Sequence, residues 1–166
     1  MLDCWNYQNL FTKLCELGYL NQLKILIKLK PNIDISAENE YAFRHACENG
    51  HLSTAQWLFQ IKPNINISVY NEVAFQSACQ NGHLSVAQWL LQIKPDINVS
   101  ADNECAFILV CSYGHLEIAQ WLLQIKPNID ISTENEDAFE SACYNGHLNV
   151  AQWLLQIKPN IDISAC

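Results

Sequence analysis

The chain has 166 residues, half of them hydrophobic and 16% charged, and a formal net charge of −8. This composition supports a buried core and is unlike that of a disordered tail. The acidic charge argues against binding to nucleic acid or anionic membranes, and the lack of an apolar run of about 20 residues argues against a membrane span.

Glycine and proline recur at one fixed spacing along the chain. The glycines are Gly18, Gly50, Gly82, Gly114 and Gly146, and the prolines are Pro31, Pro63, Pro95, Pro127 and Pro159. Both series advance by 32 residues, and no glycine or proline lies outside them. We therefore predict a single domain of five copies, at about residues 5–36, 37–68, 69–100, 101–132 and 133–166.

Each copy is predicted to contain two short helices. In the third copy, the first helix has one apolar stripe, formed by Ala74, Phe75, Ala78 and Cys79. Asn71 is the predicted N-cap of this helix and Gly82 ends it. The second helix, at residues 84–93, is apolar except for a narrow serine and glutamine stripe, so it needs neighbours on several sides. Pro95 stops it. The same pattern places the helices of the second copy at residues 40–49 and 52–61.

The first copy departs from the others, whereas the last does not. Tyr19 stands in the place of a histidine and Ile25 in the place of a tryptophan. We interpret the first copy as an atypical N-terminal cap. The fifth copy keeps the pattern of the inner copies, so either the array is cut short here or its uncapped final face is covered by something outside this sequence, self-association included.

Three residue types recur once per copy and invite a chemical interpretation. They are the cysteines 15, 47, 79, 111 and 143, the histidines 51, 83, 115 and 147, and the tryptophans 57, 89, 121 and 153. Helices pack about 8–10 Å apart, too far for disulfides or converging metal ligands between copies. We interpret all three series as structural, with the tryptophans in the core; a base-stacking platform is the alternative that the acidic charge disfavours.

No catalytic triad, phosphate loop or paired-carboxylate cleft is visible in the sequence. We therefore expect no enzymatic activity, no catalytic residues, no metal and no cofactor. The first residues contain no basic and apolar signal segment. The expected location is intracellular, in the cytoplasm, with reduced cysteines.

The motifs of each copy resemble the ankyrin repeat. Residues 78–84 resemble the family's Ala-Ala-x-x-Gly-His-Leu link, and residues 86–91 resemble its Val-Val-Lys-Leu-Leu-Leu helix. The hairpin glycine is missing and the period is 32 residues, against about 33 in the family. The resemblance implies an all-α solenoid with short or absent β-hairpins. The divergent motifs are also similar to the ankyrin repeats of giant DNA viruses of amoebae.

The copies differ mainly along one stripe of the first helix and at the loop tips. The predicted partner-binding residues are Tyr41, Arg44, His45, Glu48, Tyr70, Gln76, Gln80, Ile108, Leu109, Ser112, Tyr113, Asp137, Glu140 and Tyr144. The resemblance implies that this stripe lines the concave face, where the family usually binds proteins. Drift at solvated positions is the alternative, but the apolar Ile108 and Leu109 favour an interface.

The predicted function is therefore a non-catalytic scaffold that binds a protein partner, with no nucleic acid and no membrane involved. If the viral similarity holds, the partner is a host protein. The alternative is a structural or self-associating repeat protein.

Overall fold

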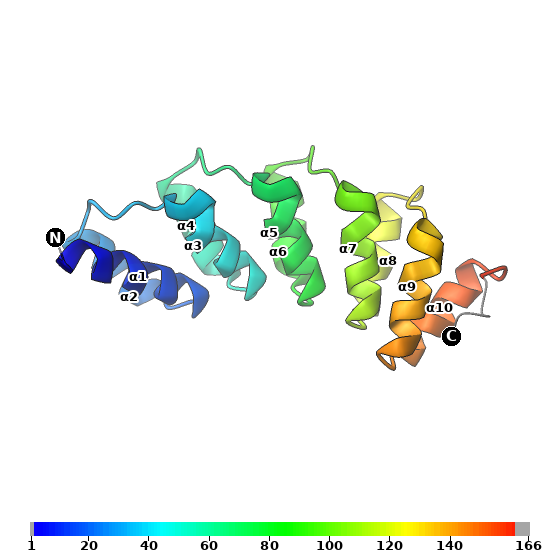
Figure 1. The fold of residues 1–166 in the computed structure, drawn as a ribbon. Helices are drawn as coiled ribbons and strands as arrows, with labels where there is room; N and C mark the ends of the chain where they lie inside the picture. The colour runs from blue at the N-terminus through cyan, green and yellow to red at the C-terminus, as the bar shows by residue number, and fades with distance from the viewer. Residues whose placement is uncertain (1, 162–166) are drawn as a thin grey trace.

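The structure of the protein is a computed structural model that describes the backbone of residues 2–161 and the side chains of residues 7–132 and 137–161. The described residues form ten α-helices and no β-strand (Figure 1). In chain order the helices are α1 (Leu2–Glu16), α2 (Leu20–Leu29), α3 (Ala37–Glu48), α4 (Leu52–Ile61), α5 (Val69–Gln80), α6 (Leu84–Ile93), α7 (Ala101–Ser112), α8 (Leu116–Ile125), α9 (Thr133–Tyr144) and α10 (Leu148–Ile157). The predicted all-α repeat solenoid without hairpins is confirmed.

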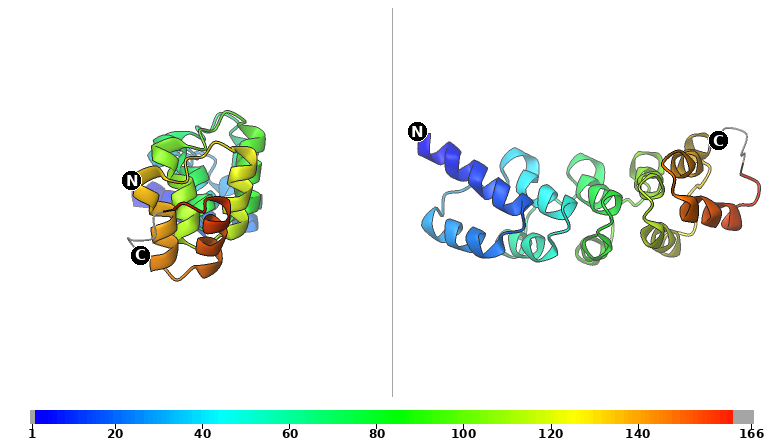
Figure 2. Two further views of the ribbon diagram at one scale, coloured as in Figure 1. Left: turned by 90° about the vertical axis from the view of Figure 1, so that its right-hand side faces the viewer. Right: turned by 90° about the horizontal axis from the view of Figure 1, so that it is seen from below.

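The helices form two rows that run the length of the molecule. The odd-numbered helices lie side by side in one row and the even-numbered helices in the other, with the long loops along one edge and the short turns along the opposite edge (Figure 1). Seen from below, the copies follow one another along a single axis (Figure 2). The odd-numbered helices pack more closely from copy to copy than the even-numbered ones. The row of α3, α5, α7 and α9 is therefore the inner row, and we call its solvent-facing surface the inner face.

The first helices of copies two to four begin with an unexpected left-handed turn. In α5 this turn is Tyr70, Asn71 and Glu72, at φ of 51°, 54° and 68°, and α3 and α7 repeat it. The prediction that Asn71 is the N-cap is wrong, because it lies inside this turn and the right-handed helix begins after it. A left-handed residue other than glycine costs about 1–2 kcal/mol, so the turn requires compensating contacts.

A buried carboxylate supplies those contacts in each of these copies. Glu40, Glu72 and Glu104 are nearly inaccessible to solvent. Ser68 Oγ donates to both carboxylate oxygens of Glu72, at 2.7 and 2.8 Å, and Ser36 Oγ donates to one carboxylate oxygen of Glu40. Glu40 also accepts a hydrogen bond from the backbone N–H of Asn66, at 3.3 Å. The carboxylate thus ties the left-handed turn to the loop that leaves the second helix of the same copy.

The tryptophans pack against the preceding copy, but they are half-buried and not enclosed in the core as predicted. The ring centroids of Phe43 and Trp89 are 6.2 Å apart, and those of Phe75 and Trp121 are 6.3 Å apart. On its other side, Trp121 lines a shallow depression on the outer surface together with Gln88 and Gln120. Each tryptophan therefore joins two copies through one side of its ring and meets solvent with the rest.

None of the described helices is both long enough and apolar enough to cross a membrane.

Candidate protein-binding face

Glycine and histidine make the junction between successive copies. The imidazole of His51 lies against Gly18, and the same contact joins His83 to Gly50. A Cβ at Gly50 would come within 2.5 Å of His83 Nδ1, so only glycine leaves room for the ring. The contact recurs at Gly82 and Gly114. These glycines also have positive φ, between 74° and 80° at Gly50, Gly82 and Gly114, which side chains other than glycine adopt at a cost.

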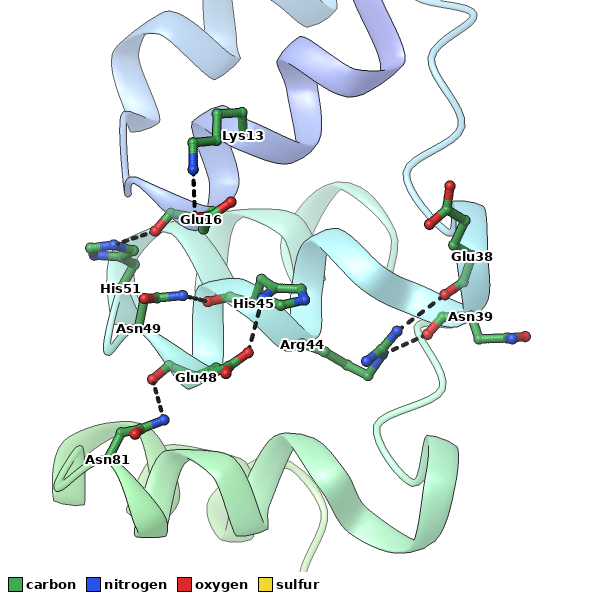
Figure 3. A network of polar contacts seen from close by, with 10 residues as sticks. All are labelled: Lys13, Glu16, Glu38, Asn39, Arg44, His45, Glu48, Asn49, His51 and Asn81. Carbon is green, nitrogen blue, oxygen red and sulfur yellow. Dashed lines mark hydrogen bonds and ion pairs between the residues drawn. The ribbon is translucent and has the colours of Figure 1, made fainter. Parts of the chain in front are cut away.

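Hydrogen bonds across the junction fix the inner row of helices. His51 Nε2 lies 2.9 Å from the backbone oxygen of Glu16, and Asn81 Nδ2 donates to the backbone oxygen of Glu48 at 3.1 Å (Figure 3). Asn145 likewise reaches back to Ser112 Oγ of the preceding copy, at 3.0 Å. The bonds to Glu16 and Glu48 satisfy carbonyls at the ends of the first helices, where the last carbonyls have no partner within their own helix.

The pKa of His83 lies below its ordinary value. Burial against Gly50 is the main cause, since it disfavours the charged imidazolium. The hydrogen bond with the backbone oxygen of Glu48 opposes this effect, and the neighbouring His51 and His115 add to it. The junction of copies two and three therefore favours the neutral form of the His83 imidazole.

We expect stability to fall as the pH drops below neutrality because of His83. Its pKa is depressed in the folded protein, so between that value and the ordinary value of about 6.5 the unfolded chain binds more protons. The free energy of unfolding then decreases as the pH falls through this window. Melting curves between about pH 7 and pH 5.5 should show the decrease, and His83→Gln should flatten it. If the melting temperature of the parent protein does not change over this pH range, the prediction that protonation of His83 destabilises the folded protein is wrong.

The cysteine series has the properties of core residues. Burial raises the pKa of the Cys15 thiol to about 12 and raises those of Cys47, Cys79 and Cys111 well above their ordinary value. A protonated thiol is a poor nucleophile and a poor metal ligand. Among the described residues, no three histidine, cysteine, aspartate or glutamate side chains converge as metal ligands would.

The structure places the predicted partner-binding residues on the first helices, except Tyr113, which caps the C-terminal end of α7, and they lie at different depths. Three tyrosines are exposed: Tyr70, Tyr113 and Tyr144. Those that are half-buried are Tyr41, Arg44, His45, Glu48, Gln80, Ile108, Leu109, Ser112, Asp137 and Glu140. Gln76 is buried. The stripe is thus one surface in register from copy to copy, but its members do not contribute equally to it.

Two members of the stripe are engaged by the left-handed turns. Arg44 Nε donates to the backbone oxygen of Asn39 at 2.9 Å, and its Nη2 donates to that of Glu38 at 3.2 Å (Figure 3). One copy further, Gln76 Nε2 donates to the backbone oxygen of Asn71 at 3.0 Å. The side chains of Arg44 and Gln76, which occupy equivalent positions, therefore stabilise the left-handed turns. Because Gln76 is also buried, we exclude it from the proposed partner surface.

Copy two of the stripe is organised by aromatic and polar contacts. The Arg44 guanidinium lies 5.4 Å from the Tyr41 ring centroid and 5.2 Å from that of Tyr70, which belongs to the next copy. His45 packs on Tyr41 with ring centroids 4.0 Å apart, and its Nδ1 lies 2.9 Å from Glu48 Oε2. This end of the inner face is held in one arrangement before any partner arrives.

Copies four and five present different chemistry at the same positions. Ile108 and Glu140 occupy the places of Arg44 and Gln76, and neither can donate a hydrogen bond to the turn. Tyr113 is half-exposed, and Tyr144 is 92% exposed. No lysine or arginine occurs between residues 101 and 125 or between residues 133 and 157. This half of the inner face is therefore apolar, aromatic and acidic.

Paired helices in two rows, joined by glycine–histidine contacts, define a helical repeat protein. The family model of ankyrin repeats, which spans three copies, matches residues 10–101 and again residues 75–165. The chain belongs to the ankyrin repeat family. No curated protein matches it in sequence.

Proposed function

We propose that this protein is a non-catalytic scaffold that binds a protein partner on its inner face, centred on copies four and five. Ankyrin repeats generally mediate protein–protein interaction. The observation that carries the proposal is the surface formed by Ile108, Leu109, Tyr113 and Tyr144, which combines two half-buried apolar side chains with two exposed tyrosines. Apolar and aromatic anchors dominate the free energy of most interfaces.

The charge of this surface indicates the kind of partner. Asp137 and Glu140 flank the apolar centre, and no cation of copies four and five offsets them within their helices. A partner segment with apolar anchors and flanking lysine or arginine complements this surface. Arg44, between Tyr41 and Tyr70, forms the far end of the same face and disfavours a basic segment there.

The similarity of the motifs to ankyrin repeats of giant amoebal viruses supports a narrower proposal, in which the partner is a host protein met in the host cytoplasm. The proposal of a host partner is tested by itself when the protein is used to capture partners from an amoebal lysate and, in parallel, from an unrelated lysate. Equal recovery of the same partner from both lysates would remove its support.

The experiment for the proposed face compares two double variants, one on the inner face and one on the even-numbered row of helices. Ile108→Asp with Leu109→Ser is expected to abolish capture of the partner, because it places a charge at the apolar centre. Gln88→Glu with Gln120→Glu, on the even-numbered row, is expected to leave capture unchanged. Ile108 is half-buried, so Tyr144→Ser, at a fully solvated position, supplies a second inner-face variant that cannot act through unfolding. Loss of capture in the outer pair alone would place the functional face on the opposite side.

A self-associating protein is the second candidate, and one observation favours it. Leu148 of copy five is 66% exposed, whereas Leu52, Leu84 and Leu116 at the same position are half-buried. Mass measurement over a range of concentrations separates the two candidates, since a scaffold for other proteins stays at the mass of one chain.

A further inference from the structure

The three buried glutamates of the left-handed turns do not receive the same hydrogen bonds. In each of these copies the serine four residues earlier donates to the carboxylate. Glu40 has a second donor, the backbone N–H of Asn66 at 3.3 Å. Glu104 has a cation beside it, since Lys126 Nζ lies 3.9 Å from its Oε1. Within the part of the chain that the structure describes, Glu72 receives hydrogen bonds from its serine alone.

The lysine that follows the second helix takes different partners in copies three and four. Lys126 Nζ donates to Ser100 Oγ, next to the carboxylate of Glu104. Its counterpart Lys94 donates to Asp96 Oδ1 instead, at 3.0 Å. Asparagine stands in the place of Asp96 in the other copies, at positions 32, 64, 128 and 160. Copy three thus has an additional carboxylate that engages its lysine away from the buried one.

A depression lies beside Glu72, where the start of α5 meets the loop before α7 and the start of α7, on the edge of the long loops (Figure 1). Its volume is about 390 Å³, and it is lined by Ser68, Asn71, Glu72, Asn98, Ala101 and Asp102. Asp102 adds an exposed carboxylate to this lining, and it accepts a hydrogen bond from Asn71 Nδ2 at 3.1 Å. Copy two has the phenol of Tyr70 at that place. The lining therefore combines two carboxylates, a hydroxyl and two amides, without a cationic side chain.

The chemistry of the depression favours an ammonium group. A buried carboxylate is stable only where hydrogen-bond donors or a cation replace the water that it has lost. Glu72 is 7% exposed, and its two oxygens share the single hydroxyl hydrogen of Ser68, so both can accept more. Lys126 provides the example of a group that fits such a serine and glutamate pair. A divalent metal ion fits less well, because it needs about six oxygen ligands and the described side chains contain no cluster of three ionisable ligands.

We propose that the depression beside Glu72 binds a primary ammonium group, supplied by a lysine of a protein partner or by a free amine. The ammonium donates to Ser68 and Glu72 as Lys126 does in copy four, and Asp102 attracts it from the rim. The depression lies on the loop edge, so this proposal does not depend on partner binding by the inner face.

Titration of the full chain with a lysine derivative tests the proposal. The probe is Nα-acetyl-lysine methylamide, added at constant ionic strength while backbone amide resonances are followed by NMR. Saturable shifts are expected for residues 68–72 and 98–102, and the Nζ-acetylated probe, which has no ammonium, should cause none. A parallel titration with 1,4-diaminobutane distinguishes the sources. Tighter binding of the lysine derivative supports a protein lysine, and tighter binding of the diamine supports a free amine.

Two glutamine variants test whether Glu72 holds the probe. Glu72→Gln is expected to weaken binding at least about tenfold, because the ion pair is lost. Glutamine suits this position, since Gln8 stands at the equivalent place in copy one and exchanges two hydrogen bonds with the backbone of Asp34. Glu104→Gln is the matched control and should leave binding unchanged, because Lys126 already engages that carboxylate.

Lys126→Ala should create a second site of the same kind. Without the lysine, Ser100 and Glu104 have the arrangement of Ser68 and Glu72, so the probe is expected to cause new shifts at residues 100–104. The proposal is overturned if the parent gives no saturable shifts, if the neutral probe binds equally well, or if Glu72→Gln binds as tightly as the parent. Should Glu72→Gln fail to fold, a Lys126→Ala protein that gains no second site overturns it instead.

Discussion

Replacing Gly50 by alanine is expected to destabilise the protein much more than replacing Gly146 by alanine. Both glycines have positive φ, 74° and 77°, so both changes carry a similar backbone cost of about 1–2 kcal/mol. Only at Gly50 does the new Cβ also collide with a ring, at 2.5 Å from His83 Nδ1. Displacing that ring disturbs a close-packed junction, which adds about 1–3 kcal/mol. Chemical denaturation of the two variants measures the difference directly.

A rescue experiment identifies the cause of the difference. In a His83→Ala background the ring is absent, so Gly50→Ala should cost no more than Gly146→Ala does in the parent. The interaction free energy from this double-mutant cycle isolates the contact between the glycine and the histidine. If both alanine substitutions lower the free energy of unfolding of the parent equally, the backbone conformation alone would explain why glycine recurs in each copy.

The positions of the helices could be predicted because the strongest local signals coincide with their ends. The second helix of copy two was placed at residues 52–61, and α4 is Leu52–Ile61. Gly50 and Pro63 bracket it, and both act through local sterics that need no knowledge of the rest of the fold. The 32-residue period then carries the same assignment to every copy.

The left-handed turns could not be predicted, because no local signal favours them. Glu38, Asn39 and Glu40 contain no glycine, yet all three have φ between 55° and 61°. The turn depends on burying Glu40 against the backbone N–H of Asn66, which lies 26 residues further along the chain. Local residue preferences do not report a contact of that sequence separation, so the sequence predicts a helix cap at the nearest asparagine instead of the turn.

The structure gives the burial and contacts of the predicted binding residues, and their part in partner binding stays a proposal. Variation between copies identified Arg44 and Gln76 as surface residues, but both donate to backbone oxygens of the turn. Two different side chains thus perform one local task, which sequence variation alone cannot distinguish from partner selection. The exposed fraction of each side chain helps to make this distinction, and it moves the proposed centre of the binding surface toward Tyr113 and Tyr144.

Replacing Trp89 by alanine is expected to cost about 2–4 kcal/mol, somewhat less than truncation of an enclosed ring because Trp89 is only half-buried. The cost remains large because the ring joins two copies. Its centroid lies 6.2 Å from that of Phe43 and 6.0 Å from that of Phe59, the second contact being edge-on. In a linear array this loss should concentrate at the junction of copies two and three. Thermal melting and amide hydrogen exchange measure the size and the location of the effect.

Trp121→Ala is the matched control, since Trp121 contacts Phe75 and has Leu91 where Trp89 has Phe59. Trp89→Ala should therefore be the more costly change, by about 0.5–1.5 kcal/mol for the additional aromatic pair. Phe59→Leu makes copy two resemble the others, and in that background the two tryptophan variants should become equal. Equal costs in the parent would mean that the edge-on contact adds nothing beyond the area it buries. A loss of stability near zero at both sites would show instead that the copies are held together by the glycine–histidine junctions and the odd-numbered helices alone.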